Sequence, residues 1–305
     1  MSGPLVDRGD GATGALLDDI DARPGSTASF LRTIIGLYLR RLDGWIATAD
    51  LVRLMTDLGV PAARTRTALA RVKRHGLLVP DRRDAIGYRL AASAEPMLAR
   101  GDRRIFAVRQ MTREEGWCLI SFSVPESRRD LRHQLRRRLG WIGCGMVSAA
   151  LWVCPDHLGD EAQEIVDELG AGPFATVFRG ATPGADPSVA VQSWWDLDAL
   201  RREHETFQAA IPSLLSTRAA EPGAAGATGT GKAGGGTLPI DDAAAFADYV
   251  RLIDAWRILP YVDPGLPAEL LPADWPGTRS VAGFAELSAR LDAPSWRHVQ
   301  AVTNR

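Results

Sequence analysis

The sequence has few cysteines, and none stands in a pattern typical of a disulfide framework or a metal site. Its 305 residues include three, Cys118, Cys144 and Cys154, with no CxxC pair and no histidine at metal-binding spacing. An odd, sparse count argues against a disulfide scaffold and suits a reducing compartment. We therefore expect Cys144 and Cys154 to be small residues of a protein core.

The sequence also lacks a long hydrophobic run. No apolar stretch reaches the ~18 residues that a membrane span needs. The first residues, MSGPLVDRGDGATGALLDDIDARPGS, do not show the charged and then apolar pattern of a secretory signal. We predict a cytoplasmic protein that does not associate with a membrane.

Catalytic motifs are missing as well. The five histidines are scattered, and there is no HExxH, no nucleophile elbow and no pair of carboxylates in an apolar setting. The sequence therefore predicts no catalytic residue, no metal ligand, no cofactor and no enzymatic activity.

The net charge is small, but this balance hides a basic region. The formal net charge is −1 at pH 7. Residues 28–91 nevertheless contain 12 Lys or Arg against 5 Asp or Glu, whereas residues 241–305 contain 6 Arg against 9 acids. A basic segment inside a neutral chain favours a polyanionic partner for that segment.

The N-terminal part shows three helical patterns followed by two short strands. Hydrophobic periodicity and the stop signals at Gly59 and Gly76 predict these elements, in order, at 30–42, 48–58, 61–75, 77–79 and 88–91. The order is typical of a winged helix-turn-helix, which we place at 26–93. Residues 1–25 are rich in Gly, Asp and Ala, and we predict that they form a disordered tail.

A different pattern follows in the middle of the chain. The predicted order is strand, helix, strand, strand, helix, strand, which is the ferredoxin-like βαββαβ arrangement, and we assign it to a central module at 94–190. Residues 191–305 are predicted to form a mainly helical domain, interrupted by a flexible Gly-rich insert at 216–238. The predicted fold class is therefore a multidomain α+β protein.

The third helix, PAARTRTALARVKRHG (61–76), contains five Arg or Lys and no acid. A solvated face with cations near the negative C-terminal end of the helix accounts for Lys73 and Arg74. It does not account for Arg64 and Arg66, because the helix dipole disfavours cations in the first turn. In a helix-turn-helix, the N-terminal part of the second helix meets base edges in the major groove. The first-turn arginines therefore favour DNA binding.

Spacing along this helix suggests a division of roles. Arg64, Thr67 and Arg71 lie at positions that share one face, and arginine pairs bidentately with guanine. Lys73 and Arg74 are better placed to hold phosphates. The predicted DNA-binding residues, including two at the tip of the wing, are Arg64, Thr65, Arg66, Thr67, Arg71, Lys73, Arg74, Arg82 and Arg83.

The helix of the central module, RRDLRHQLRRRLG, is a second basic helix with no single interpretation. Its arginines are consistent with DNA contact, with an anionic ligand, with pairing to the acidic helix at 160–168, or with a solvated face. For a ligand site, the candidate residues of this helix and of the tryptophan-rich later segments are Arg128, Arg129, Arg132, Arg136, Trp152 and Trp256.

Several segments resemble the PaaX family, the repressors of phenylacetic acid degradation. TRTALARVKRHGLL is similar to the recognition helix of that family, and GYRLA is similar to the end of its wing. WCLISFSVPE, the Arg-rich helix after it, and LWVCP resemble its central module. DAWRILPYVDPGLPAELLPADWPG is similar to its C-terminal signature and is the most specific match. The resemblance extends over roughly 28–292.

The resemblance implies a homodimeric transcriptional repressor that binds a palindromic double-stranded DNA operator. In the family, phenylacetyl-CoA or a related acyl-CoA releases the DNA, and we expect such an effector here, although no motif identifies it. The central module is also similar to a CRISPR-associated nuclease subunit. Its first strand ends in SFSVP and lacks the acidic metal ligand, which argues against nuclease activity.

Two alternatives remain from the sequence. One is an enzyme, either a nuclease or an acyl-CoA-processing protein, with an appended winged helix. The other is a protein-interaction module whose winged helix binds protein instead of DNA.

Overall fold

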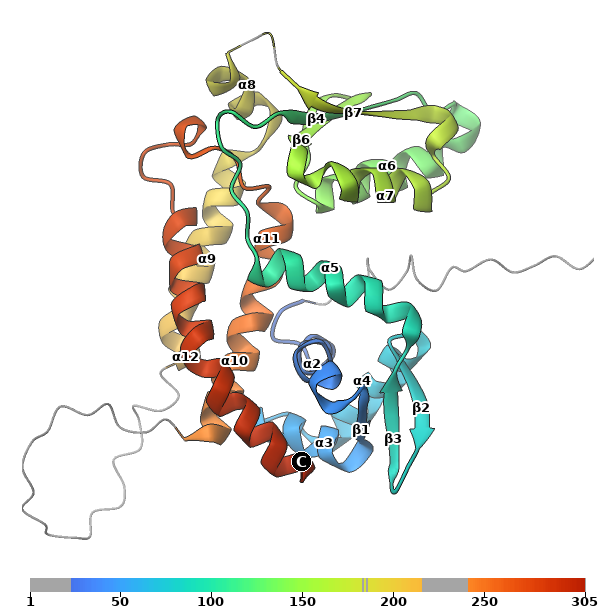
Figure 1. The fold of residues 1–305 in the computed structure, drawn as a ribbon, viewed down its shortest axis with the longest axis vertical. Coiled ribbons are helices and arrows are strands. Elements are labelled where there is room, and N and C mark those ends of the chain that lie inside the picture. Colours follow the sequence, from blue (N-terminus) through green and yellow to red (C-terminus); the bar gives the residue numbers. More distant parts are fainter. Residues whose placement is uncertain (1–22, 183, 185, 216–240, 305) are drawn as a thin grey trace, which may run out of the picture. The chain divides into compact units, whose positions relative to one another are not determined.

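The computed structural model describes residues 23–182, 184, 186–215 and 241–304. The predicted tail at 1–25 lies almost wholly outside the described residues, and the predicted insert at 216–238 lies entirely outside them. The described chain is α+β, with helices and two antiparallel sheets (Figure 1). No helix within it is long and apolar enough to cross a bilayer.

The chain divides into two compact units, each assembled from separate segments. Unit 1 consists of Met1–Arg100, Gln208–Ala255 and Gly283–Arg305, and unit 2 consists of Gly101–Phe207 and Trp256–Ala282. This division differs from the predicted domains at 26–93, 94–190 and 191–305. The helices of 191–305 do not form a unit of their own, since both units use some of them.

Unit 1 begins with three helices and a small sheet. Its first elements are α2 (Thr27–Ile34), a π-helical turn (Ile35–Leu39), a 3₁₀ turn (Arg40–Leu42), β1 (Trp45–Ala47), α3 (Thr48–Asp57), α4 (Ala62–Arg74), β2 (Leu78–Arg82) and β3 (Ile86–Leu90). The sheet is antiparallel with the strand order β1-β3-β2. The three predicted helices and the hairpin are therefore present in the predicted order, and β1 is an additional strand.

The sequence analysis missed β1 because it is three residues long and its residues are all buried, so it shows no alternation of polar and apolar side chains. Its pairing with β3 depends on a glycine. A Cβ on Gly87 would lie 2.4 Å from the Ile46 carbonyl oxygen and 2.7 Å from the Trp45 ring. A larger residue at 87 would therefore displace the first strand of the sheet.

Two helices from the C-terminal part complete the core of unit 1. They are α10 (Asp242–Trp256) and α12 (Gly277–Thr303). The buried Asp254 of α10 accepts hydrogen bonds from the hydroxyls of Ser29 and Thr33 on α2. Tyr38 packs against Phe246 with ring centroids 5.9 Å apart. Through these contacts the N-terminal helices bury part of the apolar surface of α10.

Unit 2 is built on a four-stranded sheet. Its elements are β4 (Trp117–Phe122), α6 (Arg129–Trp141), β5 (Gly145–Ser148), β6 (Leu151–Pro155), α7 (Gly159–Glu168) and β7 (Ala175–Ala181). The antiparallel strand order is β5-β6-β4-β7. The strand and helix order predicted for the central module is therefore the order that the structure contains.

The remaining helices are α5 (Glu95–Phe106), α8 (Pro187–Trp194), α9 (Leu197–Leu215) and α11 (Leu259–Val262). No helix is predicted from the sequence at 95–106, although the apolar and polar residues of this segment separate onto two faces of a helix. This omission matters, because the last turn of α5 carries a cluster of basic residues in unit 2.

Both faces of the unit 2 sheet are covered. On one face, α6 and α7 lie side by side and bury Leu135 and Ile165 against Ile120 of β4 (Figure 1). On the other face, Trp195 packs against Trp117 with ring centroids 5.9 Å apart. The three cysteines are free thiols buried in this sheet region, as predicted for Cys144 and Cys154.

Candidate nucleic-acid interface

Helix α4 begins directly after a tight turn. Gly59 adopts a positive φ of 83°, which favours glycine, and Pro61 is the N-cap residue. Proline was predicted inside the first turn, so the helix starts one residue later than expected. No side chain caps this end. The first amide groups of α4 therefore receive no hydrogen bond from the side chain of the N-cap residue, and a helix N-terminus of this kind favours an anion.

The two faces of α4 differ completely in character. Its inner face is buried and consists of Thr65, Ala68, Leu69 and Val72. Its outer face is exposed and carries every predicted basic residue of the helix, namely Arg64, Arg66, Arg71, Lys73 and Arg74, together with Thr67. The inner face fixes the rotation of the helix, so the cations are held toward solvent.

Thr65 departs from the prediction. Its side chain is completely buried, and its hydroxyl donates to the Pro61 carbonyl oxygen at 3.4 Å. The residue lies three positions before Ala68 and belongs to the inner face of the helix. We therefore remove Thr65 from the set of residues that face a nucleic acid.

An open pocket of about 750 Å³ lies along the outer face of α4. Small residues of the helix leave room in it, and its other side is formed by the N-cap residue of α2 and the first two residues of that helix. Its lining residues are Ser26, Thr27, Ala28, Ala63, Arg64, Thr67, Ala68, Ala70, Arg71 and Arg74. The structure thus brings Arg64, Thr67 and Arg71 together, as their spacing predicted. Arg74 joins them, whereas Arg66 and Lys73 lie outside the pocket.

The sequence analysis missed the contribution of α2 to this pocket. Ser26 is the N-cap of α2, and its hydroxyl accepts a hydrogen bond from the Ser29 amide at 3.2 Å. A capping serine predicts where a helix begins, but it does not reveal which other helix that end approaches. The contact between α2 and α4 comes from tertiary packing.

The cations of α4 are not neutralised by any residue whose position the structure describes. Within the described part of the chain, no Asp or Glu forms an ion pair with Arg64, Arg66, Arg71, Lys73 or Arg74. Exposed, unpaired cations on one helix face produce a positive potential that attracts a polyanion. This combination of an apolar inner face and an unneutralised outer face is what a helix that binds nucleic acid requires.

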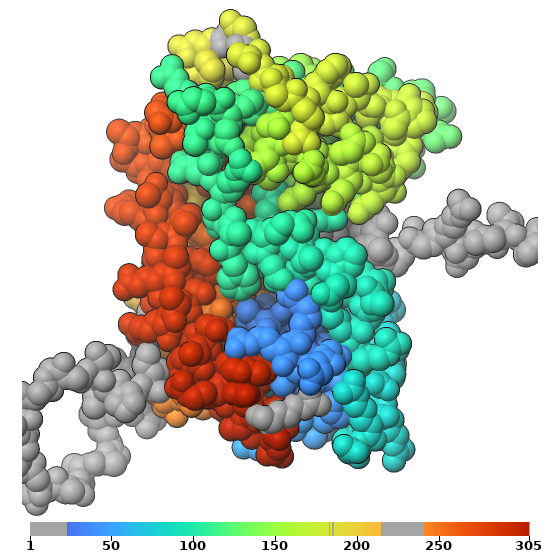
Figure 2. Space-filling model, viewed as in Figure 1, coloured from blue at the N-terminus to red at the C-terminus, as the bar shows by residue number. Residues whose placement is uncertain are grey.

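The hairpin of β2 and β3 carries the other two predicted basic residues. Arg82 and Arg83 are both exposed, and the hairpin (teal) lies at the surface in the space-filling view (Figure 2). Arg83 is partly engaged, since its guanidinium lies 3.7 Å from Asp81 and 5.3 Å from the centre of the Trp45 ring. Ile86 is 68% exposed beside them, so the tip combines basic and apolar surface.

The six predicted ligand residues differ in burial, since the two tryptophans are buried and the four arginines are not. Trp152 and Trp256 are buried in hydrophobic cores, and the indole N–H of Trp256 donates to the Ile105 carbonyl oxygen at 3.1 Å. Their aromatic side chains act as packing, so we correct the prediction for both. Neither of the two pockets that we describe is lined by Trp152, Trp256, Arg128, Arg129, Arg132 or Arg136.

The arginines of α6 are largely engaged with nearby groups. Arg132 forms an ion pair with Glu126 at 2.8 Å, and Arg136 donates to the Ala149 carbonyl oxygen at 2.6 Å. Arg138, which was not a candidate, is 2% exposed and lies 2.9 Å from Glu168 of α7. Pairing between this helix and the acidic helix, one of the alternatives from the sequence, is therefore present at Arg138.

No group of three or more His, Cys, Asp or Glu side chains suited to hold a metal ion occurs among the residues with described positions.

Comparison with known proteins places the whole arrangement in one family. Three family models match successive parts of the chain and together span most of it. They are "PaaX-like protein" at 26–94, "PaaX protein central Cas2-like domain" at 110–191 and "PaaX-like protein C-terminal domain" at 232–301.

Individual relatives agree with this match. The chain is 26% identical over 269 residues to the transcriptional repressor PaaX of Escherichia coli strain K12, with 85% of this chain and 78% of that protein covered. Its fold is similar to that of the uncharacterized protein Rv0674 from Mycobacterium tuberculosis, with a TM-score of 0.53, 22% identity, and coverage of 89% and 97% of the two chains. The chain therefore belongs to the PaaX family.

Proposed function

We propose that this protein is a transcriptional repressor that binds double-stranded DNA through α4. In this proposal α2, α3 and α4 with the β2–β3 hairpin form a winged helix-turn-helix. The observation that carries the proposal is the outer face of α4, where Arg64, Thr67 and Arg71 line an open pocket and no carboxylate of the described residues neutralises the two arginines. The repressor function of the E. coli relative supports the same conclusion.

The positions of the side chains suggest how DNA is contacted. Arg64 and Arg71 line the pocket on the outer face and are the proposed readers of base edges in the major groove. Arg66 and Lys73 are exposed at its sides and are the proposed phosphate contacts. The uncapped N-terminus of α4 and the wing residues Arg82 and Arg83 would add further backbone contacts.

We further propose that two copies bind a palindromic operator. A two-fold symmetric dimer places two identical α4 helices on two half-sites, so that the symmetry of the operator reflects that of the protein. The sheet of unit 2, interpreted as a ferredoxin-like module, and the C-terminal helices are the proposed source of the dimer. An acyl-CoA such as phenylacetyl-CoA would then release the DNA by binding more tightly to a dimer with unsuitable half-site spacing.

The proposal assigns no catalytic activity to the chain. If the protein is instead an enzyme, it should convert a substrate. Incubation with divalent metal and nucleic acid, or with phenylacetyl-CoA, is expected to leave both substrates unchanged when the products are separated by chromatography.

The test begins with the selection of a binding site from random duplexes by the full-length protein. Fluorescence anisotropy then measures affinity for the selected duplex across a range of salt concentrations. We expect a palindromic site and a steep fall in affinity with salt, because phosphate contacts release counterions. The selected site also permits a count of bound protomers by analytical ultracentrifugation.

Two single variants make this test specific. Arg71→Ala is expected to weaken binding by about 1–3 kcal/mol and to relax base preference at one position of each half-site. Arg290→Ala is the matched control, since Arg290 is an exposed arginine of unit 1 far along α12 with no ion pair in the described chain. Equal affinity of the Arg71→Ala and wild-type proteins would refute the assignment of α4.

A further inference from the structure

Unit 2 contains a pocket that no predicted residue lines. It has a volume of about 240 Å³ and lies between the last turn of α5, the connection from β6 to α7, and α11. Its basic residues are Arg103, Arg104 and Arg109, and His157 and two carboxylates also reach it. The net charge of this cavity depends on which of the three arginines already form ion pairs within the protein.

Arg104 has a structural role. It is 8% exposed, and its guanidinium donates to the Ile142 carbonyl oxygen at 2.9 Å and to the Pro260 carbonyl oxygen at 3.3 Å. It also forms an ion pair with Glu161 at 3.1 Å. Arg104 therefore connects α5 to the residue after α6, to α7 and to α11, and its guanidinium already has hydrogen-bond partners within the protein.

The two carboxylates of the pocket also have partners within the protein. Glu161 is held by Arg104, and Asp263 lies 2.7 Å from the buried His204 and accepts a hydrogen bond from the Gly265 amide at 2.9 Å. Arg103 is exposed, and no acid pairs with it in the described residues. Arg109 pairs with Glu115, which lies outside the pocket lining. The pocket therefore retains a positive charge, carried mainly by Arg103.

His157 adds a neutral polar group. Burial and the neighbouring arginines lower the pKa of His157 to about 4, so the ring is uncharged at neutral pH. Its Nδ1 atom is buried and has no hydrogen-bond partner in the part of the chain that is described. A buried polar atom without a partner is costly.

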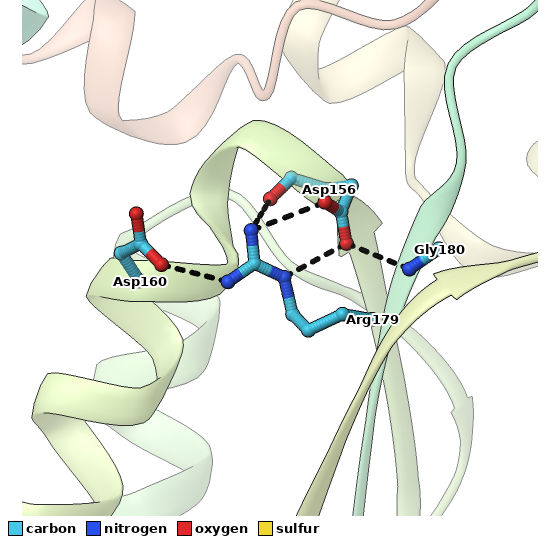
Figure 3. Close-up of polar contacts among 4 residues, drawn as sticks. All are labelled: Asp156, Asp160, Arg179 and Gly180. Carbon is cyan, nitrogen blue, oxygen red and sulfur yellow. Dashed lines mark hydrogen bonds and ion pairs between the residues drawn. The ribbon is translucent and has the colours of Figure 1, made fainter.

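An ion-pair cluster fixes the segment that carries His157. The guanidinium of Arg179 on β7 reaches Asp156 through Nε at 2.8 Å and Asp160 through Nη1 at 2.7 Å, and Asp156 also accepts from the Gly180 amide (Figure 3). These bonds lower the pKa of Asp156 and raise that of Arg179. Gly159 makes the approach possible, because a Cβ there would lie 2.3 Å from Arg179 Nε. The loop before α7 is therefore held in a defined position before any ligand arrives.

The remaining wall of the pocket is apolar. Ala107, Val108, Leu158 and Pro260 line it, and Val108 is 37% exposed at its edge. Pockets for drug-sized ligands are usually about 300–1,000 Å³, so this one suits a smaller molecule or one end of a larger molecule. A CoA thioester would place only its acyl end or one phosphate group inside.

We propose that this pocket binds an anionic oxygen group of a small organic molecule, with Arg103 as the main cation, Arg109, which is shared with Glu115, as the second, and Val108 and Leu158 as the apolar contact. The neutral His157 ring would donate the remaining hydrogen bond to this oxygen. The inference rests on the proposed effector response and specifies where that effector binds. The anionic group has two possible sources, a carboxylate or a phosphate, and the binding experiment distinguishes them.

The test uses the full-length protein without DNA. Isothermal titration calorimetry at pH 7 measures the binding of three probes: phenylacetate, coenzyme A and phenylacetyl-CoA. If phenylacetate binds and coenzyme A does not, the anionic group that the pocket takes is a carboxylate. If coenzyme A binds, the anionic group is a phosphate. Arg103→Ala should lower the affinity for the probe that binds by about tenfold or more, because one charge-assisted hydrogen bond is lost. Arg202→Ala is the control, because Arg202 is exposed in the same unit and outside the pocket.

The outcomes separate this proposal from the repressor function. If no probe binds the wild-type protein at millimolar concentration, or if Arg103→Ala and Arg109→Ala both bind like wild type, the pocket assignment is overturned. DNA affinity of the same samples is measured without any probe. If the wild-type protein does not bind DNA in this measurement, the repressor function is refuted instead, whatever the calorimetry shows.

Discussion

Helices α4 and α6 have the same length and a similar density of arginine, yet the cations of the two helices differ in whether they are paired within the protein. Both span 13 residues. On α4, the five cations are exposed and have no carboxylate partner among the described residues. On α6, Arg132 and Arg138 form ion pairs, and Arg136 is bound to a backbone carbonyl oxygen.

The difference teaches that basic composition alone does not identify a nucleic-acid surface. A cation contributes to the external potential only when the fold leaves it unneutralised. The acids that neutralise α6 come from residue 126 just before it and from α7, 30 residues after Arg138. Helix α4 has no acidic neighbour of this kind, and its positive charge faces the solvent.

The largest expected effect is on DNA affinity. The double variant Arg64→Ala/Arg71→Ala on α4 should lose about 2–6 kcal/mol of binding free energy, the sum for two arginine contacts to bases. The matched double variant Arg132→Ala/Arg136→Ala on α6 should bind close to wild type. Fluorescence anisotropy with the selected duplex at one salt concentration measures both. A similar loss in the two variants would remove the distinction between the helices.

The next effect concerns the free energy of unfolding. Here a substitution on α6 is expected to have a larger effect than a substitution on α4. Arg138→Ala on α6 should destabilise the protein by about 2–3 kcal/mol, because it leaves Glu168 without its buried partner. This value is below that of a fully buried pair, since the Glu168 side chain is 40% exposed. Arg74→Ala on α4 should change stability by less than about 0.5 kcal/mol. Urea unfolding followed by circular dichroism compares the two midpoints.

A pH effect is expected in unit 2. The pKa of His157 falls from 6.5 to about 4 on folding, so the unfolded chain binds a proton first as the pH decreases. Stability is unaffected by this group above pH 6.5 and declines between pH 6.5 and 4. The loss should be on the order of 1–2 kcal/mol, reduced because the ring is only partly buried. The charged groups near the ring are Arg103, Arg104, Arg109, Glu115, Glu161 and Asp263.

The check is a comparison of urea unfolding at pH 7 and pH 4.5 for wild type and His157→Gln. The variant should lack this part of the pH dependence, while other groups contribute equally to both proteins. An identical pH dependence in the two proteins would show that His157 titrates normally. DNA binding by α4 at pH 7 should be the same for both.

The smallest effect separates base reading from phosphate contact on α4 itself. Lys73→Ala should weaken binding to all duplexes alike and should reduce the slope of log affinity against log salt by about 1. Arg71→Ala should instead weaken the selected duplex more than a scrambled one. If Lys73→Ala changes base preference, the roles assigned to the two residues are wrong.

Much of unit 1 was predictable because its signals are local. Helical periodicity and Gly59 and Gly76 located α3 and α4, and the spacing of Arg64, Thr67 and Arg71 placed them on one face. Thr65 was misplaced because a polar residue type suggested exposure. Its burial follows from the rotation of α4, which is determined by packing against α2 and α3.

The pocket of unit 2 was not predictable for the opposite reason. Arg103, His157 and Pro260 are far apart in the sequence, so no local pattern connects them. The ligand residues proposed from the sequence relied on the charge of α6 and on tryptophan content. Tryptophan is more often a packing residue than a ligand contact, and Trp152 and Trp256 pack in the cores.

By itself, the sequence determined the order of helices and strands, the concentration of positive charge in α4, and the family to which the chain belongs. These depend on residues that are close together in the chain. The tertiary structure alone decided which cations stay unpaired, that Thr65 is buried, and that Arg103 and His157 share a pocket. Whether a charge is neutralised depends on which distant carboxylate lies within a few ångströms, and this proximity is established only when the chain folds.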